Sequence, residues 1–182
     1  MRHSYGLVVY SHKTHEKCAD LLLIRLSKIK LAQIVLSAIT TAGFIAALFG
    51  AGPVAAGIGV VVSTVLLVLN AYVKDYDLGE IAQKHRHAAA DIWLVRERYR
   101  ALITDLRVGK DSLEKMTARR DALTNELHEA YAGAPSTNDK AYKKAQEGLQ
   151  RLEEMSFSEE EIDALLPAEL RKGGGGELNR SH

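Results

Sequence analysis

Three side chains in the second half of the chain have the chemistry to hold an anion. Trp93, Arg96 and Arg100 are spaced by three and four residues, so they lie on one side of a predicted helix. Guanidinium groups beside an aromatic ring can clamp a stackable anionic ligand such as a nucleotide. Glu97 lies among them, however, and acids interspersed with arginines are typical of a solvated, ion-paired helix face. The sequence leaves both interpretations open.

A second set of polar residues lies in a stretch that is otherwise apolar. Gln33, Ser37 and Thr41 recur every four residues and so follow one side of a predicted helix. In a membrane they can hydrogen-bond to polar residues of a neighbouring helix, or they can line a narrow aqueous path in an oligomer. The stretch has no charged ring to act as a filter, so we expect any such pore to discriminate poorly among ions.

Other chemistry is not indicated. His85 and His87 have no third or fourth ligand at a suitable spacing, so we predict no metal centre. Glycine-rich phosphate loops and nucleophile elbows are missing from the sequence, and we therefore expect no enzymatic activity and no cofactor. Cys18 is the single cysteine, which excludes an intrachain disulfide. With a net charge of +1 we expect no DNA or RNA binding.

A long uncharged run must position the first polar set. Residues 31–73 contain no Asp, Glu, Lys, Arg or His over 43 positions, although the mean hydropathy of the whole chain is only −0.11. One membrane-spanning helix needs about 20 apolar residues. Gly50 and Pro53 interrupt the run at its midpoint and favour a turn followed by a new helix. We therefore predict a transmembrane hairpin of two helices, at residues 31–49 and 53–73, because the rest of the chain is too small to bury both.

Small residues recur within both predicted membrane helices. They form two stripes of four-residue spacing, Ala38, Ala42, Ala46 and Gly50 in the first helix and Ala55, Gly59 and Ser63 in the second. Such residues let helix backbones approach closely in lipid. The stripes can pack the hairpin against itself, or one of them can pack against another subunit.

Basic residues predict the orientation of the hairpin. They flank the run on both sides, at Arg25, Lys28 and Lys30 before it and at Lys74, Lys84 and Arg86 after it. The positive-inside rule then places both termini in the cytoplasm. We expect no cleavable signal peptide, because the apolar run is much longer than the core of a signal peptide and turns back on itself.

The remaining residues predict polar helices. We expect a cytoplasmic N-terminal helix within residues 1–30, a cytoplasmic helical bundle over 74–172 and a flexible tail at 173–182. Apolar residues alternate at three and four positions in a heptad seam that indicates a coiled coil: Leu78, Ile81, His85, Ala88, Ile92, Val95, Tyr99, Leu102 and Leu106. A histidine in such a seam is typically a core residue with a partner. The predicted fold class is an all-α membrane protein.

Capping patterns predict where the later helices begin. Asp111 with Glu114 and Ser158 with Glu161 each have the three-residue spacing of a capping box. Another helix is predicted between them, at residues 139–154.

Several segments together resemble a known family. The stretches at 69–78, 92–99, 131–135 and 157–163 occur in the order and spacing of the SLATT family, and the similarity extends over about residues 11–172. These are two-transmembrane effectors associated with SMODS nucleotidyltransferases and SLOG domains in bacteria. The resemblance implies antiviral defence by abortive infection: a cyclic oligonucleotide made by a SMODS-type nucleotidyltransferase triggers an effector that opens a pore in the inner membrane.

Two functions of different classes follow. The chain can be a pore-forming effector that forms a homo-oligomer in the lipid bilayer through the seam and the small-residue stripes. Alternatively, it can be a non-conducting membrane anchor whose helical bundle recruits a cytoplasmic partner. Replacing the Gln33, Ser37 and Thr41 side chains by leucine distinguishes them, because only a pore depends on polar residues that face water.

Overall fold

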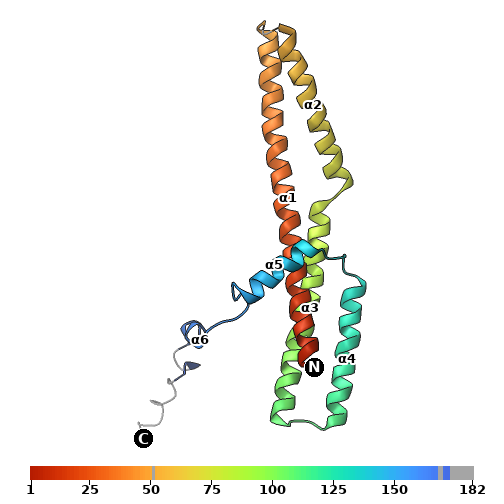
Figure 1. The fold of residues 1–182 in the computed structure, drawn as a ribbon, viewed down its shortest axis with the longest axis vertical. Coiled ribbons are helices and arrows are strands. Elements are labelled where there is room, and N and C mark those ends of the chain that lie inside the picture. The colour runs from red at the N-terminus through yellow and green to blue at the C-terminus, as the bar shows by residue number, and fades with distance from the viewer. Residues whose placement is uncertain (51, 168–169, 173–182) are drawn as a thin grey trace. The chain divides into compact units, whose positions relative to one another are not determined.

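The computed structural model describes residues 1–50, 52–167 and 170–172. Over these residues the α-helices follow in this order: α1 (Arg2–Leu48), α2 (Gly52–Asp75), α3 (Leu78–Val108), α4 (Leu113–Ala132), α5 (Asp139–Gln150) and α6 (Glu159–Leu165) (Figure 1). The described residues contain no strand, and the all-α fold class is therefore confirmed. The predicted flexible tail at 173–182 lies outside the described residues.

The first helix is longer than predicted and has no break at the end of its polar part. α1 runs for 47 residues from Arg2, through the basic residues, to Leu48. Residues 1–30 are therefore not a separate helix but the first half of the same rod that enters the apolar segment. Gly50 follows with a φ of 94°, a conformation that glycine adopts without strain, and the chain turns there as predicted.

The second and third helices meet at a short break after the apolar segment. α2 ends at Asp75, and Asp77 then caps α3 by accepting a hydrogen bond from the backbone N–H of Glu80 at 2.8 Å. α3 ends at Gly109, which has a φ of 67°. α1 lies beside α2 over the apolar segment and beside α3 over the polar segment (Figure 1).

The predicted helix starts were partly correct. Ser158 and Glu161 form the predicted capping box of α6. The box predicted at Asp111 and Glu114 was wrong, because Ser112 is the residue whose side chain accepts from a backbone N–H, that of Lys115, at 3.4 Å. The helix predicted over 139–154 ends at Gln150.

The core lies among the polar halves of the helices. We call residues 2–30 of α1, together with α3 and α4, the polar bundle. Its core cluster joins one residue of α1, four of α3 and two of α4: Val8, Ile92, Val95, Tyr99, Leu102, Met116 and Leu123. Most of the predicted α3 seam is therefore buried, although Leu106 is exposed. Within the chain, this seam packs against Val8 of α1 and against Met116 and Leu123 of α4.

The chain divides into two compact units, residues 1–145 and 146–182. The first holds α1 to α4 and the start of α5, where Ala141 and Ala145 are buried and Tyr142 stacks on Tyr10 with 5.9 Å between ring centroids. In the second unit, Lys172 pairs with Glu159 at 2.6 Å.

Candidate functional site

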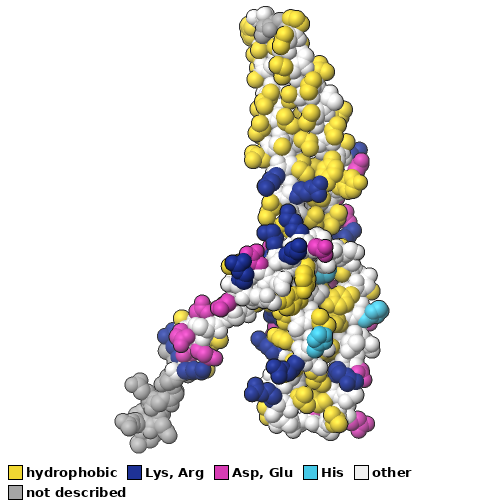
Figure 2. All heavy atoms as spheres, in the orientation of Figure 1, with side chains coloured by type: hydrophobic (Ala, Val, Ile, Leu, Met, Phe, Trp, Pro, Cys, Tyr) yellow, Lys and Arg dark blue, Asp and Glu magenta, His cyan; other side chains and the backbone are white. Residues whose placement is uncertain are grey.

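The apolar halves of α1 and α2 are not packed into a protein core. We call residues 31–48 of α1 and 52–73 of α2 the membrane hairpin. Both helices are long and apolar enough to cross a membrane, and none of the residues in their most apolar windows is buried within the molecule. Large side chains such as Phe44 and Leu48 are more than two-thirds exposed. Hydrophobic side chains cover the hairpin in the space-filling view, and Lys and Arg side chains gather where it ends (Figure 2).

One of the three pore-lining candidates bridges the two helices of the hairpin. Gln33 of α1 donates from Nε2 to Oδ1 of Asn70 of α2 at 2.7 Å. This is the cross-helix hydrogen bond that the sequence allowed. It uses one donor of the Gln33 amide and one acceptor of the Asn70 amide, so each amide retains capacity for a further partner.

The other two candidates turn away from the second helix. A step of four residues rotates an α-helix by about 40° beyond a full turn, so the line from Gln33 through Ser37 to Thr41 winds away from α2. Ser37 and Thr41 are exposed, and the Thr41 hydroxyl donates to the Ser37 carbonyl oxygen at 3.0 Å. The line is therefore a short spiral, and only its first member faces the partner helix.

The two small-residue stripes have different surroundings. Ala38, Ala42 and Ala46 of the first stripe are all exposed. Ala38 and Ala42 share one side of α1 with Ser37 and Thr41, and we call these four residues the outer face of α1. In the second stripe Ala55 and Gly59 are half-buried, and both line a groove that α1 and α2 share.

This groove runs within the membrane hairpin and has a volume of about 480 Å³. Its walls carry small and hydroxyl side chains, including Thr40 and Gly43 of α1 and Ser63 and Thr64 of α2. Thr40 and Thr64 donate to backbone carbonyl oxygens of their own helices, at 2.8 and 2.9 Å. The groove walls are therefore largely apolar.

Aromatic and basic residues mark the base of the hairpin. The Arg25 guanidinium lies 5.4 Å from the centroid of the Tyr72 ring, which stacks on Tyr76 at 5.0 Å. A cation over an aromatic ring is attracted by the negative face of the ring. Tyrosine and arginine at this level are typical of the interface between lipid and water.

The candidate anion-binding residues lie in the polar bundle and share one carboxylate. Arg96 donates to Oε1 of Glu97 at 3.0 and 2.7 Å, and Arg100 pairs with Oε2 of the same residue at 2.6 Å. Trp93 is about half exposed. Two guanidinium groups therefore converge as the clamp requires, but Glu97 already binds both, so an anionic ligand must compete with it.

A histidine cluster joins the first half of α1 to α3, and sequence reasoning found only one of its members. His12, His15 and His85 are all buried. Nδ1 of His15 lies 3.0 Å from Nδ1 of His85, and Nδ1 of His12 lies 3.1 Å from the carbonyl oxygen of Ala89. The predicted partner of His85 is thus His15. Val8, His12, His15 and Ala19 have helical spacing of a buried face, but the histidines disguise it as a polar stretch.

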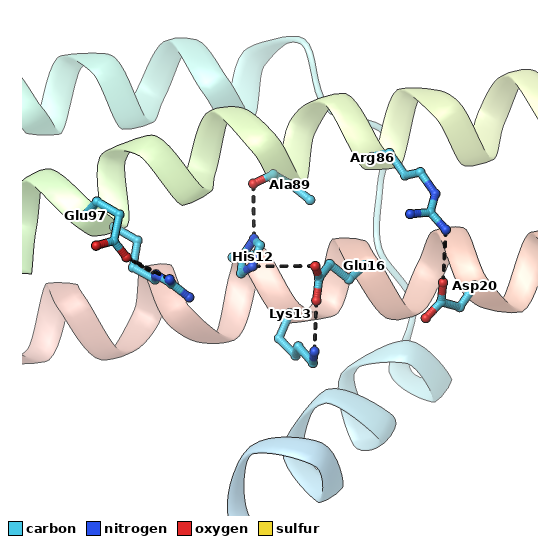
Figure 3. Close-up of polar contacts among 8 residues, drawn as sticks. His12, Lys13, Glu16, Asp20, Arg86, Ala89 and Glu97 are labelled. Atoms are coloured by element: carbon cyan, nitrogen blue, oxygen red, sulfur yellow. Dashed lines mark hydrogen bonds and ion pairs between the residues drawn. The ribbon is translucent and has the colours of Figure 1, made fainter. Parts of the chain in front are cut away.

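Other polar contacts cross the same interface. Figure 3 shows His12 beside Ala89. It also shows Asp20 beside Arg86, where Oδ1 of Asp20 lies 3.4 Å from Nη2 of Arg86. His12 also lies 3.7 Å from Glu16, which Lys13 contacts at 2.9 Å (Figure 3). These contacts tie the polar half of α1 to α3.

Burial shifts the protonation of the cluster toward the neutral form. Burial and the neighbouring histidines lower the pKa of His15 to about 4. Burial also lowers the pKa of His85, and that of His12 despite the opposing effect of Glu16. Burial raises the pKa of the Cys18 thiol, which is one helical turn from His15. At neutral pH these side chains are therefore uncharged.

Together these features define a two-pass helical membrane protein with a polar helical bundle. The chain matches the model of the SMODS and SLOG-associating 2TM effector domain family 4 over residues 1–161. It therefore belongs to this family of two-transmembrane effector domains. No curated protein and no solved structure matches the chain.

Proposed function

We propose that the protein is an anti-phage effector that assembles as a homo-oligomer and opens a pore in the bacterial inner membrane. A cyclic oligonucleotide made by a SMODS-type nucleotidyltransferase triggers the effector, and opening of the pore stops growth of the infected cell. Both termini and the polar bundle lie in the cytoplasm, as the basic residues around the hairpin favour. Membership of the family supports the link to SMODS and SLOG systems.

The main observation in support of a pore is the composition of the outer face of α1. This face presents the exposed hydroxyl groups of Ser37 and Thr41 beside Ala38 and Ala42. Lipid tails are as apolar as leucine, so apolarity alone does not join membrane helices, whereas small residues let them pack closely. The hydroxyl groups on the same face gain favourable partners, water or another helix, when copies assemble.

The trigger acts by shifting the equilibrium between a closed and an open assembly. A nucleotide opens the pore only if it binds the open assembly more tightly than the closed one. Arg96, Arg100 and Trp93 are the proposed contacts, with the guanidinium groups exchanging the Glu97 carboxylate for phosphate.

Ion and dye release from liposomes tests this function. The purified protein is reconstituted and exposed to a panel of cyclic oligonucleotides. The expected result is release with one nucleotide, its loss in the Ser37→Leu/Thr41→Leu variant, and unchanged release in Thr64→Leu. Thr64 is the matched control because it is a hydroxyl in the same membrane hairpin but outside the outer face of α1.

A non-conducting scaffold is the second candidate, and the polar bundle favours it. Trp93 and Leu94 are both about half exposed on α3, and such apolar side chains can bind a partner protein. A scaffold releases nothing under any condition, and its binding to a partner is lost in Trp93→Ala while Ser37→Leu/Thr41→Leu has no effect.

A further inference from the structure

The histidine cluster has no role in the pore or in nucleotide binding as proposed. Three imidazole rings are nevertheless buried between the polar half of α1 and α3, where His15 and His85 are each 3% exposed. Buried polar side chains of this kind are retained at a cost, since leucine in the same place would need no hydrogen bond. Unlike leucine, the His15 and His85 side chains can gain a proton as the pH falls, so the pair can respond to pH.

The hydrogen bond between the two rings exists only in certain protonation states. With both rings neutral, one Nδ1–H donates to the unprotonated Nδ1 of the other ring across 3.0 Å. With both rings protonated, each Nδ1 is a donor and each ring is positively charged. The hydrogen bond is then lost, and two like charges face each other in a buried interface.

The groups around the pair do not compensate for added protons. The electrostatic neighbours that lower the pKa of His15 are His85 and His12, both able only to add positive charge. Near His12, α1 contributes Lys13 and Glu16 and α3 contributes Arg96. Glu16 is the acid of this group and already contacts Lys13. On the α5 side, the neutral Asn138 amide donates to the Cys18 sulfur at 3.8 Å.

The helix that carries His15 transmits any change to the membrane. α1 continues without a break from Arg2 through His15 to Leu48, so its polar and apolar halves are parts of one helix. α3, by contrast, is joined to α2 through a break at residues 76–77. Separation of α1 from α3 at the histidine pair therefore changes the position of α1 at the base of the membrane hairpin.

We propose that His15 and His85 form an acid-sensitive latch, in which protonation of both rings releases the polar half of α1 from α3. The latch is closed at neutral pH, and acidification of the compartment that holds the polar bundle opens it. Its effect on conduction rests on the proposed function, because only a pore is gated by movement of α1. The latch itself is a property of the polar bundle and requires neither a nucleotide nor a pore.

Cys18 offers a direct readout of latch opening. It is the single cysteine, it is 1% exposed, and it lies three residues after His15 on α1. The full chain in lipid nanodiscs is treated with 4,4′-dithiodipyridine between pH 7.5 and pH 3.5, an interval that includes the lowered pKa of His15. Each labelling rate is divided by the rate for the denatured protein at the same pH, which removes the pH dependence of the thiol itself. This ratio measures exposure of Cys18.

We expect the ratio to rise by about tenfold or more as the pH falls across this interval. In His15→Asn/His85→Asn the ratio stays low and constant, because asparagine amides donate and accept without titrating. His87→Asn is the matched control: His87 is exposed on the same helix, so this variant follows the wild type. A flat wild-type ratio, or a rise that persists in the double variant, overturns the latch.

A second measurement covers the case in which the double variant is already open at pH 7.5. The ring nitrogens of His15 and His85 are followed by NMR in the wild-type protein over the same pH range. The latch predicts that both rings become protonated over the interval in which Cys18 becomes exposed, and protonation without exposure contradicts it. Neither readout depends on conduction, so failure of the latch and failure of the pore are separate results.

Discussion

The membrane hairpin and the polar bundle are both built from helices, and they even share α1, but they are stabilised in different ways. In the bundle, seven side chains of three helices form a closed core in which Ile92 and Leu102 have no exposed surface. In the hairpin, two helices share a groove and a single amide pair, and their large apolar side chains point outward. The bundle is folded by burial from water, whereas the hairpin depends on the bilayer around it.

A matched pair of isoleucine truncations gives the largest expected difference between the regions. Ile92→Ala removes a fully buried side chain and should lower the free energy of unfolding by about 2–5 kcal/mol. Ile58→Ala, on the exposed surface of α2, should change it by less than about 1 kcal/mol. Urea unfolding of the protein in detergent measures both, and equal losses would show that the regions do not differ in this way.

A charge introduced by substitution should be more costly in the membrane hairpin than in the polar bundle, the reverse of the isoleucine truncations. Val61→Lys places an ammonium group in the membrane hairpin and should cost about 2.5–3.5 kcal/mol of insertion free energy. Leu94→Lys, about half exposed on α3, should change stability by no more than about 0.5 kcal/mol. Membrane integration is measured by carbonate extraction, and full integration of Val61→Lys would contradict a lipid-facing position.

Acidity should destabilise the polar bundle and spare the membrane hairpin, because residues 31–71 contain no titratable side chain. His15 has an ordinary pKa of 6.5 when unfolded and about 4 when folded, so the unfolded state binds the proton first. The stability that the neutral ring provides is complete above pH 6.5 and is lost between pH 6.5 and pH 4. We expect a loss of about 1–3 kcal/mol.

Urea unfolding at pH 7.5 and pH 4 measures this loss, which should be smaller in His15→Asn/His85→Asn than in the wild type. His87→Asn should retain the full effect, because that ring is exposed. An identical pH dependence in all three proteins would assign the effect to other groups.

The smallest expected effect concerns the amide pair of the hairpin. Gln33→Leu removes the hydrogen bond to Asn70 and should destabilise the hairpin by about 0.6 kcal/mol, the average for polar contacts between membrane helices. Cross-linking between cysteines placed at positions 36 and 66 in a Cys18→Ala background compares the two proteins. A loss of several kcal/mol would mean that the pair supports more than the hairpin.

The hairpin was predictable from sequence because its signals are local. The absence of charge over residues 31–73 and the Gly50 and Pro53 pair depend only on neighbouring positions, and the turn lies where they predict it. The α3 seam was predictable for the same reason, since its three- and four-residue spacing is intrinsic to a buried helix face. Its partner in α1 was not predictable, because Val8 is distant in sequence and lies on a face that histidines disguise.

The features that sequence could not provide depend on tertiary contact. His85 was expected to have a partner, but His15 lies 70 positions away on a face whose histidines conceal its burial. Glu97 was visible among the arginines, yet only the structure shows that it binds both Arg96 and Arg100. The two small-residue stripes looked equivalent in sequence, and their different exposure follows from how α1 and α2 turn toward each other.

The most direct test of this account is the position of the hairpin tip and of the polar bundle relative to the membrane. Single cysteines replace Phe49 at the tip and Leu113 at the start of α4, both highly exposed, in the Cys18→Ala background. The cells are then treated with a membrane-impermeant maleimide. The account predicts that Phe49→Cys is labelled in cells with an intact inner membrane and Leu113→Cys only after permeabilisation. Labelling of both positions from the same side would contradict a membrane-spanning hairpin with a cytoplasmic bundle.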